Sequence, residues 1–274
     1  MNGIGSAAKR ALRAAYYTWD ESMVRRKAPD EFLTWHALES GCLDPNYFMH
    51  VVPERKFIYT EVPKTGSSFI LSELATAFGR RRAAGNMHRR AHSGLTCPRD
   101  MGIGPFVQLV ENPETFIFSS VRNPLTRLVS CYLDKFAAVV IGDNSYISNT
   151  YIAYRRVAGK FVIDGRPLSF AEFVEFACET APLKYDGHWS RQADIVSNWI
   201  AKPHVLVRFE TLSRDFAQVL TRFGADPAQV ERVLASAVTT TDHKARDLLT
   251  ERTRARIVEA YATDFARFDY PIHL

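Results

Sequence analysis

The stretch KFIYTEVPKTGSSF, residues 56–69, decides the fold of this 274-residue chain. Residues 56–62 are rich in β-branched and aromatic side chains, which predicts a strand that Pro63 ends. The apolar spacing over residues 69–78 predicts a helix, and Gly79 follows it as a C-terminal glycine does. A strand that enters a helix through a short glycine-containing turn presents backbone N–H groups at the positive end of the helix dipole. The stretch therefore predicts an α/β fold and an oxyanion site, formed by Pro63, Lys64, Thr65, Gly66, Ser67, Ser68 and Phe69.

A second strand and helix repeat this arrangement. Residues 115–121 (TFIFSSV) predict a strand, and Asn123-Pro124 suits the N-cap and first position of a helix over residues 125–140. Arg122 then lies at the carboxyl edge of the sheet, where open α/β folds bind ligands, and Ser130 lies about two turns into the helix. A guanidinium fork with a hydroxyl suits a second phosphate. The structural alternative is a surface pair of Arg127 with Asp134, with Ser130 as an ordinary helix residue.

The remaining pattern predicts alternating strands and helices. A third strand is expected at residues 204–210, and Ser169 with Glu172 forms a capping box that opens a further helix. Other helices are expected at 6–27, 212–223, 227–237 and 250–266, whereas 30–53 reads as irregular and 142–168 as a polar stretch. This order predicts a P-loop-like three-layer fold with a central parallel β-sheet flanked by helices. We expect one domain over residues 1–274, with a catalytic core at 54–270 and an N-terminal extension at 1–50.

Composition excludes several classes of protein. With 46% hydrophobic and 24% charged residues and no apolar run of about 18 residues, the chain is neither disordered nor membrane-spanning. The four cysteines form no C-x-x-C pair and the eight histidines no H-E-x-x-H pattern, so we expect no disulfide framework and no metal. A net charge of +5 and a pI near 9.0 are too mild to indicate a nucleic-acid partner.

Two motifs together resemble a known family. P-K-T-G-S-S-F (63–69) resembles the 5′-phosphosulfate loop of sulfotransferases, and F-S-S-V-R-N-P-L-T-R-L-V-S-C-Y (118–132) resembles their 3′-phosphate motif. D-G-H-W-S-R-Q (186–192), V-R-F-E-T-L (207–212) and Y-A-T-D-F-A-R-F-D-Y (261–270) are similar to segments of the carbohydrate branch, which contains the glycosaminoglycan O-sulfotransferases.

This resemblance implies a donor, 3′-phosphoadenosine 5′-phosphosulfate (PAPS), and a product, adenosine 3′,5′-bisphosphate. Lys64 would supply charge at the bridging oxygen, and Ser67, Ser68 and the loop amides would hold the 5′-phosphate. Arg122 and Ser130 would recognise the 3′-phosphate. Because a sulfuryl group carries less charge than a phosphoryl group, we expect no metal.

Three histidines are candidates for the general base that deprotonates the acceptor hydroxyl. His88 and His92 follow the first core helix, and His188 lies beside Trp189, which could stack on a sugar. We favour His92. The structural alternatives are surface or hydrogen-bonded histidines and a core tryptophan.

Basic residues indicate the acceptor. Residues 75–99 contain no acid, and Arg89 and Arg90 lie there beside the candidate bases, so we expect an acidic polysaccharide. Arg252 and Arg254 belong to a second basic stretch that could cover the nucleotide. Within the family, a lipid or small-molecule hydroxyl is the other possible acceptor.

Two other classes compete with this interpretation. A P-loop kinase or NTPase needs the order G-K-[ST] and magnesium ligands, which the sequence lacks. A non-catalytic binder of nucleotides or anionic polysaccharides would account for the arginines but not for two phosphate motifs. We expect a cytoplasmic, bacterial-type soluble enzyme; a Golgi lumenal location is the alternative if the chain is trimmed from a longer protein.

Overall fold

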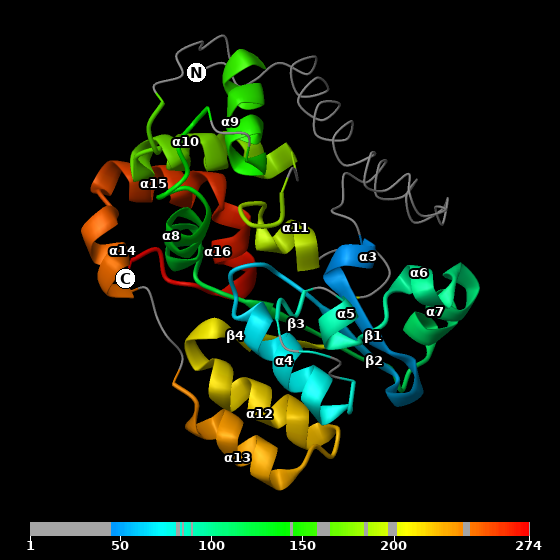
Figure 1. Ribbon diagram of the computed structural model, residues 1–274. Helices are drawn as coiled ribbons and strands as arrows, with labels where there is room; N and C mark the ends of the chain where they lie inside the picture. The colour runs from blue at the N-terminus through cyan, green and yellow to red at the C-terminus, as the bar shows by residue number, and fades with distance from the viewer. Residues whose placement is uncertain are drawn as a thin grey trace. The chain divides into compact units, whose positions relative to one another are not determined.

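The computed structural model describes residues 45–80, 83, 85–88, 90–142, 145–157, 165–183, 186–196, 202–237 and 242–273 (Figure 1). Its contacts divide the chain into two compact units. The sheet unit contains residues 30–123 and 192–240, and the helical unit contains 1–29, 124–191 and 241–274. The helix predicted at 6–27 lies outside the described residues. The expectation of one domain stays a prediction.

A four-stranded sheet forms the centre of the sheet unit. The strands lie in the order β1 (Met49–Val52), β2 (Phe57–Thr60), β3 (Phe116–Val121) and β4 (Val205–Arg208). β2, β3 and β4 are parallel, and every residue of β2 and β3 is buried, as in a sheet covered on both faces. The three predicted strands and the α/β class are therefore confirmed.

β1 corrects the prediction that residues 30–53 are irregular. It pairs antiparallel with β2 through a short 3-10 turn, η1 (Pro53–Arg55), after which Lys56 adopts a left-handed φ of 49°. The strand has only four residues, and Pro53 follows it directly, so the local pattern carries little strand signal. The result is a mostly parallel sheet with an antiparallel edge strand.

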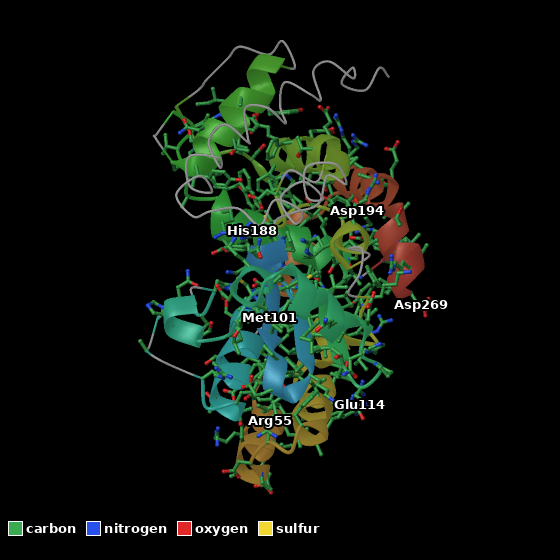
Figure 2. The ribbon with its side chains drawn as sticks, turned by 90° about the vertical axis from the view of Figure 1, so that its right-hand side faces the viewer. Arg55, Met101, Glu114, His188, Asp194 and Asp269 are labelled. Atoms are coloured by element: carbon green, nitrogen blue, oxygen red, sulfur yellow. The ribbon has the colours of Figure 1, made fainter. Side chains whose placement is uncertain are left out.

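Alternating side chains of the strands build two cores on opposite faces of the sheet. Phe57, Tyr59 and Phe118 pack with α4 (Ser67–Ala77) and α12 (Leu212–Arg222), and α13 (Pro227–Ala235) packs on α12. Ile58 and Ile117 pack instead with Phe106 of α7 (Ile103–Glu111). α6 (Pro98–Met101) precedes α7 and ends at Met101, which is labelled in Figure 2. Shorter helices complete the unit: α3 (Pro45–Phe48), α5 (Arg90–Ser93), α11 (Gln192–Val196) and the 3-10 turn η3 (Phe209–Thr211).

The described part of the helical unit consists of helices around an aromatic core. Phe136, Phe173, Phe176 and Trp189 pack together, with ring centroids 4.6–5.9 Å apart. The helices are α8 (Pro124–Lys135), α9 (Tyr146–Val157), α10 (Phe170–Thr180), α14 (Asp242–Leu248), α15 (Glu251–Ala260) and α16 (Ala262–Phe268), with the 3-10 turn η2 (Ala181–Leu183) after α10. No helix among the residues described is long and apolar enough to cross a membrane.

Several predicted boundaries in the helical unit change. The capping box is confirmed, since Glu172 N–H donates to Ser169 Oγ and Ser169 N–H donates to the Glu172 carboxylate. α8 ends at Lys135 rather than at residue 140, and α9 lies within the polar stretch at 142–168, for which no helix was predicted. The helix predicted over 250–266 is divided at the fully buried Tyr261, between α15 and α16.

Candidate functional site

The loop between β2 and α4 has the backbone of an anion site. Lys64 and Gly66 have φ angles of 71° and 84°, both left-handed, and Gly66 is the N-cap of α4. A non-glycine residue with this φ costs roughly 1–2 kcal/mol, so Lys64 is held there by its surroundings. A Cβ on Gly66 would lie 2.6 Å from Leu212 Cδ2, so glycine is required on steric grounds as well. Left-handed residues beside a helix N-terminus are typical of loops that bind phosphate and sulfate groups.

The residues of this loop divide into two groups. Thr65 is fully buried; its hydroxyl donates to Val62 O at 2.7 Å and lies 2.6 Å from Ser120 Oγ on β3. The Thr65 hydroxyl therefore holds the loop against the sheet, and the role of Thr65 at the donor stays a prediction. Phe69 is likewise structural, because its ring packs against the core near Phe216.

The other loop residues remain suited to a ligand. Lys64 is half-buried and Ser68 is exposed, whereas Ser67, the first residue of α4, is largely buried. Pro63 is buried at the start of the turn. The first turn of α4 carries no acidic residue, which keeps the positive end of its dipole uncompensated by its own side chains.

Arg122 joins the second motif to this loop. It lies at the end of β3, and its Nη1 donates to Lys64 O at 3.3 Å. Its guanidinium carbon is 3.9 Å from the centroid of the Phe209 ring. The structure thus brings the arginine and the lysine of the two predicted phosphate motifs together. Ser130 is half-buried on α8 in the helical unit, so its role at the 3′-phosphate stays a prediction.

Two residues that sequence reasoning missed hold the backbone at Arg122. Gln192 is fully buried; its Oε1 accepts from Arg122 N at 2.9 Å, and its Nε2 donates to Arg122 O at 2.7 Å. Glu210 Oε1 accepts from Asn123 N at 2.8 Å. Gln192 and Glu210 belong to the segments 186–192 and 207–212, which are similar to segments of the carbohydrate branch, and this similarity was the signal that could have identified them.

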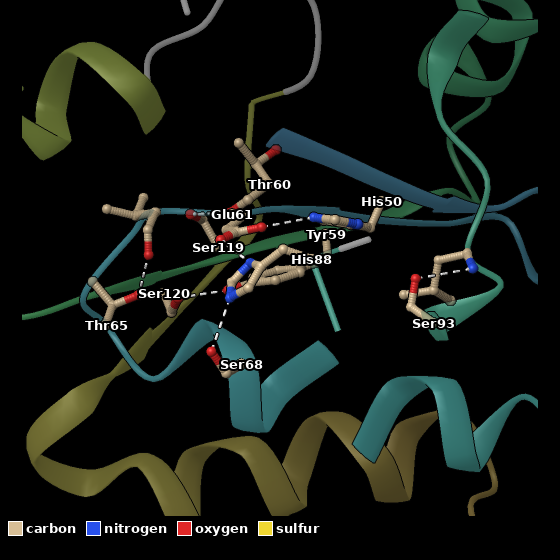
Figure 3. Close-up of polar contacts among 12 residues, drawn as sticks. His50, Tyr59, Thr60, Glu61, Thr65, Ser68, His88, Ser93, Ser119 and Ser120 are labelled. Atoms are coloured by element: carbon tan, nitrogen blue, oxygen red, sulfur yellow. Dashed lines mark hydrogen bonds and ion pairs between the residues drawn. The ribbon is translucent and has the colours of Figure 1, made fainter. Parts of the chain in front are cut away.

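A chain of polar side chains leads from the sheet to the loop (Figure 3). His50 Nε2 on β1 lies 2.9 Å from Glu61 Oε2, and His88 Nδ1 lies 2.8 Å from Glu61 Oε1. On the other side of the ring, His88 Nε2 lies 2.8 Å from Ser68 Oγ, at the start of α4. Of the candidate bases, His88 is thus in direct contact with the predicted donor loop.

The carboxyl group of Glu61 is strongly perturbed. It is 1% exposed, and burial alone would raise its pKa. The hydrogen bonds and charges of His50 and His88 outweigh burial and lower the pKa to about 2. Glu61 is therefore an ionised carboxylate between two histidines at neutral pH.

The other two histidines have different partners. His92 lies on α5 with its Nδ1 3.0 Å from Asn86 O. His188, in the helical unit (Figure 2), has its Nδ1 2.6 Å from Asp186 Oδ1. Burial raises the pKa of Asp186, but His188 and the hydroxyl of Tyr146 outweigh this effect and lower it.

Trp189 is a core residue. It is fully buried, and its Nε1 donates to Thr180 Oγ1 at 3.0 Å. An indole enclosed in this way offers no face to a sugar, so the prediction of sugar stacking is corrected to its structural alternative.

The structure also revises the roles of several arginines. Arg127 is buried and donates to Gly187 O and Ser190 O, which rules out the surface pair with Asp134. Arg252 and Arg254 lie on α15, which packs against α10; the Arg252 guanidinium is 3.9 Å from the Glu175 carboxylate. These contacts do not test the expected cover over the nucleotide. Arg89 lies outside the described residues, and Arg90 opens α5.

A mostly parallel sheet flanked by helices, with a glycine-containing loop after β2 and an arginine after β3, defines an α/β protein in which the two predicted phosphate motifs meet. The sulfotransferase family matches residues 48–271. The chain belongs to this family, and the resemblance seen in its two phosphate motifs is confirmed.

Individual relatives are carbohydrate sulfotransferases by name. The chain is 26% identical over 236 residues to carbohydrate sulfotransferase 9 of Homo sapiens, covering 80% of this chain and 48% of that protein. It is 25% identical over 228 residues to carbohydrate sulfotransferase 14 of Danio rerio, covering 80% of this chain and 61% of the relative. The chain therefore spans about half to three fifths of the length of these relatives.

Proposed function

We propose that this protein transfers the sulfuryl group of PAPS to a hydroxyl of a carbohydrate. The observation that carries the proposal is the contact of Arg122, which follows β3, with the backbone of Lys64, which lies in the loop after β2. The chain that makes this contact belongs to the sulfotransferase family. The names of the relatives support a carbohydrate acceptor. In this reaction the acceptor oxygen forms a bond to sulfur, the bond from sulfur to the bridging phosphate oxygen breaks, and adenosine 3′,5′-bisphosphate leaves.

The loop residues fit the donor. When PAPS is bound, it supplies the activated sulfuryl group. Lys64 then stabilises negative charge at the bridging oxygen, while Ser67, Ser68 and the first amides of α4 hold the 5′-phosphate. Arg122 recognises the 3′-phosphate, and no metal takes part in our proposal.

His88 is the general base in this proposal, in place of His92. Its Nε2 lies 2.8 Å from the hydroxyl of Ser68, so it stands beside the loop that holds the reacting group. His92 instead contacts Asn86 O, within its own segment. His188 is the second candidate, because the Asp186 carboxylate supports its ring.

The acceptor and the compartment are finer parts of the proposal. We keep the acidic polysaccharide, bound by Arg89 and Arg90, because residues 75–99 carry arginines and no acid. The cytoplasmic location also stays a prediction.

Binding and transfer experiments test the proposal. Calorimetry without magnesium should give tight binding of adenosine 3′,5′-bisphosphate and weak binding of ATP. A screen with radiolabelled PAPS should then label carbohydrates in preference to lipids or small alcohols. Stronger binding of ATP, or a requirement for magnesium, would favour a P-loop NTPase. Nucleotide binding without transfer to any acceptor would favour a non-catalytic binding protein.

A further inference from the structure

We propose that Glu61 is a positioning residue, which holds the His88 ring with its proton on Nδ1 so that the Nε2 lone pair faces the donor loop. This inference rests on the proposed function, because the tautomer of His88 affects the reaction only if His88 deprotonates the acceptor hydroxyl. Glu61 itself lies behind the imidazole and contacts His50 and His88 through its two carboxylate oxygens.

The geometry fixes the direction of the carboxylate. Glu61 directly follows β2, and its backbone N–H donates to Phe48 O at 2.7 Å, which pins the chain at this point. His50 is 1% exposed and its ring stacks on Tyr59, with the centroids 5.8 Å apart. A buried partner therefore holds one oxygen of Glu61 in place while the other oxygen meets His88.

The protonation states follow from the close approach of each ring nitrogen to a negative charge. A ring nitrogen without a proton would turn its lone pair toward the ionised carboxylate, so the charge of Glu61 favours a proton on the nitrogen that lies 2.8–2.9 Å from it. For His88 this nitrogen is Nδ1, which leaves Nε2 of the singly protonated ring as an acceptor for the Ser68 hydroxyl. The titratable groups that face Glu61 are His50 from β1, Tyr59 from β2 and His88. Burial and the nearby Glu61 charge raise the pKa of Tyr59, so it stays neutral.

This arrangement has two consequences for a base at His88. The ring already presents a lone pair at Nε2, so no tautomer exchange is needed before proton transfer. When Nε2 takes the acceptor proton, the imidazolium forms beside a buried carboxylate, which stabilises it. The same logic makes a buried carboxylate behind a catalytic histidine worth orders of magnitude in kcat.

The key variant is Glu61→Gln, with Glu114→Gln as its matched control. Glu114 is exposed and pairs with Lys56 at the surface of the same unit, so its variant should behave as wild type (Figure 2). In Glu61→Gln an amide N–H₂ can face Nδ1 and drive the proton to Nε2. We expect kcat to fall about 10²–10⁴-fold, with the affinity for adenosine 3′,5′-bisphosphate unchanged. In a His88→Ala background the same substitution should add little, because Glu61 acts through that ring.

A spectroscopic readout separates positioning from a structural role. Nitrogen-15 NMR of labelled histidines should show His88 protonated at Nδ1 in the wild type and in Glu114→Gln, and a shift toward Nε2 in Glu61→Gln. A purely structural role of Glu61 would leave the tautomer of His88 unchanged in the folded variant.

Several outcomes would overturn the inference. Wild-type His88 protonated at Nε2 refutes it without any variant, even if Glu61→Gln fails to fold. Full additivity of Glu61→Gln with His88→Ala, or an unchanged kcat in folded Glu61→Gln, refutes it as well. Failure of the proposed function looks different, because the wild type would then bind no adenosine 3′,5′-bisphosphate whatever the tautomer of His88.

Discussion

Replacing Gln192 by alanine should destabilise the sheet unit, and it should also lower the affinity of the protein for adenosine 3′,5′-bisphosphate. Gln192 is fully buried, and its side-chain amide makes two hydrogen bonds with the backbone of Arg122. In Gln192→Ala, the N–H and the C=O of Arg122 lose these partners in a site closed to water. The backbone of Arg122, the residue that we assign to the 3′-phosphate, would then be held less firmly.

The magnitude follows from the two backbone groups. Loss of a hydrogen-bond partner by a buried polar group costs about 1–3 kcal/mol, and two such groups are affected, so we expect the free energy of unfolding to fall by about 2–6 kcal/mol. Gln108→Ala is the matched control, because Gln108 is exposed on α7, and such a substitution usually changes stability by less than about 0.5 kcal/mol.

Urea unfolding followed by circular dichroism measures the stability, and calorimetry measures the affinity for adenosine 3′,5′-bisphosphate. The affinity should fall at least tenfold in Gln192→Ala, while adenosine 5′-phosphate should lose less. Equal stability of the Gln192 and Gln108 variants would refute the role of the amide. A destabilised Gln192→Ala protein with unchanged affinity would refute the link to Arg122.

Four further predictions concern the site. Lys64→Ala should lower kcat roughly 10²–10³-fold in a folded protein, because the charge acts on the leaving oxygen; near-normal turnover by radiolabel transfer would contradict this. Arg122→Ala should lose about 1.5–3 kcal/mol of the preference for the 3′,5′-bisphosphate over the 5′-phosphate, and calorimetry showing an unchanged ratio rules it out. The carboxyl of Glu61, lowered from 4.5 to about 2, should contribute on the order of 3 kcal/mol of stability, present above pH 4.5 and lost as the pH falls toward 2. Denaturant unfolding across that range should therefore show a shallower decline for Glu61→Gln, and parallel curves would count against it. Reversing Arg89 and Arg90 to glutamate should raise KM for a charged glycan and weaken its salt dependence, with KM for PAPS as the unaffected control.

Local patterns were sufficient for much of the fold. The strands at residues 57–60 and 116–121 are runs of β-branched and aromatic residues that fill the core, so burial and local preference agree there. The positions of Lys64, Gly66 and Arg122 after β2 and β3 could be predicted, because strand and helix signals lie directly beside them in the sequence. Each of these signals lies within a few residues of chain.

What could not be predicted depends on partners that are distant along the chain. His50 reaches Glu61 only because β1 pairs antiparallel with β2, with His50 opposite Tyr59, and no local pattern encodes that register. The choice between His88 and His92 as the base depends on where each ring lies relative to the loop, which no local pattern encodes. The burial of Trp189 could not be predicted, because the rings that enclose it belong to Phe136 and Phe176, which are distant from it along the chain.

The interleaving of the two units has a consequence for synthesis on the ribosome. β3 ends at Val121, and its pairing partner β4 begins only at Val205, so the last parallel ladder of the sheet must wait until the intervening chain has emerged. At about 5–20 residues per second, the exposed edge of β3 stays without that partner for several seconds. During this time Arg122 also lacks Gln192, which is made later. The nascent chain therefore passes through a state with an open, apolar sheet edge, and it should depend on chaperones more than a protein whose domains follow one another along the chain.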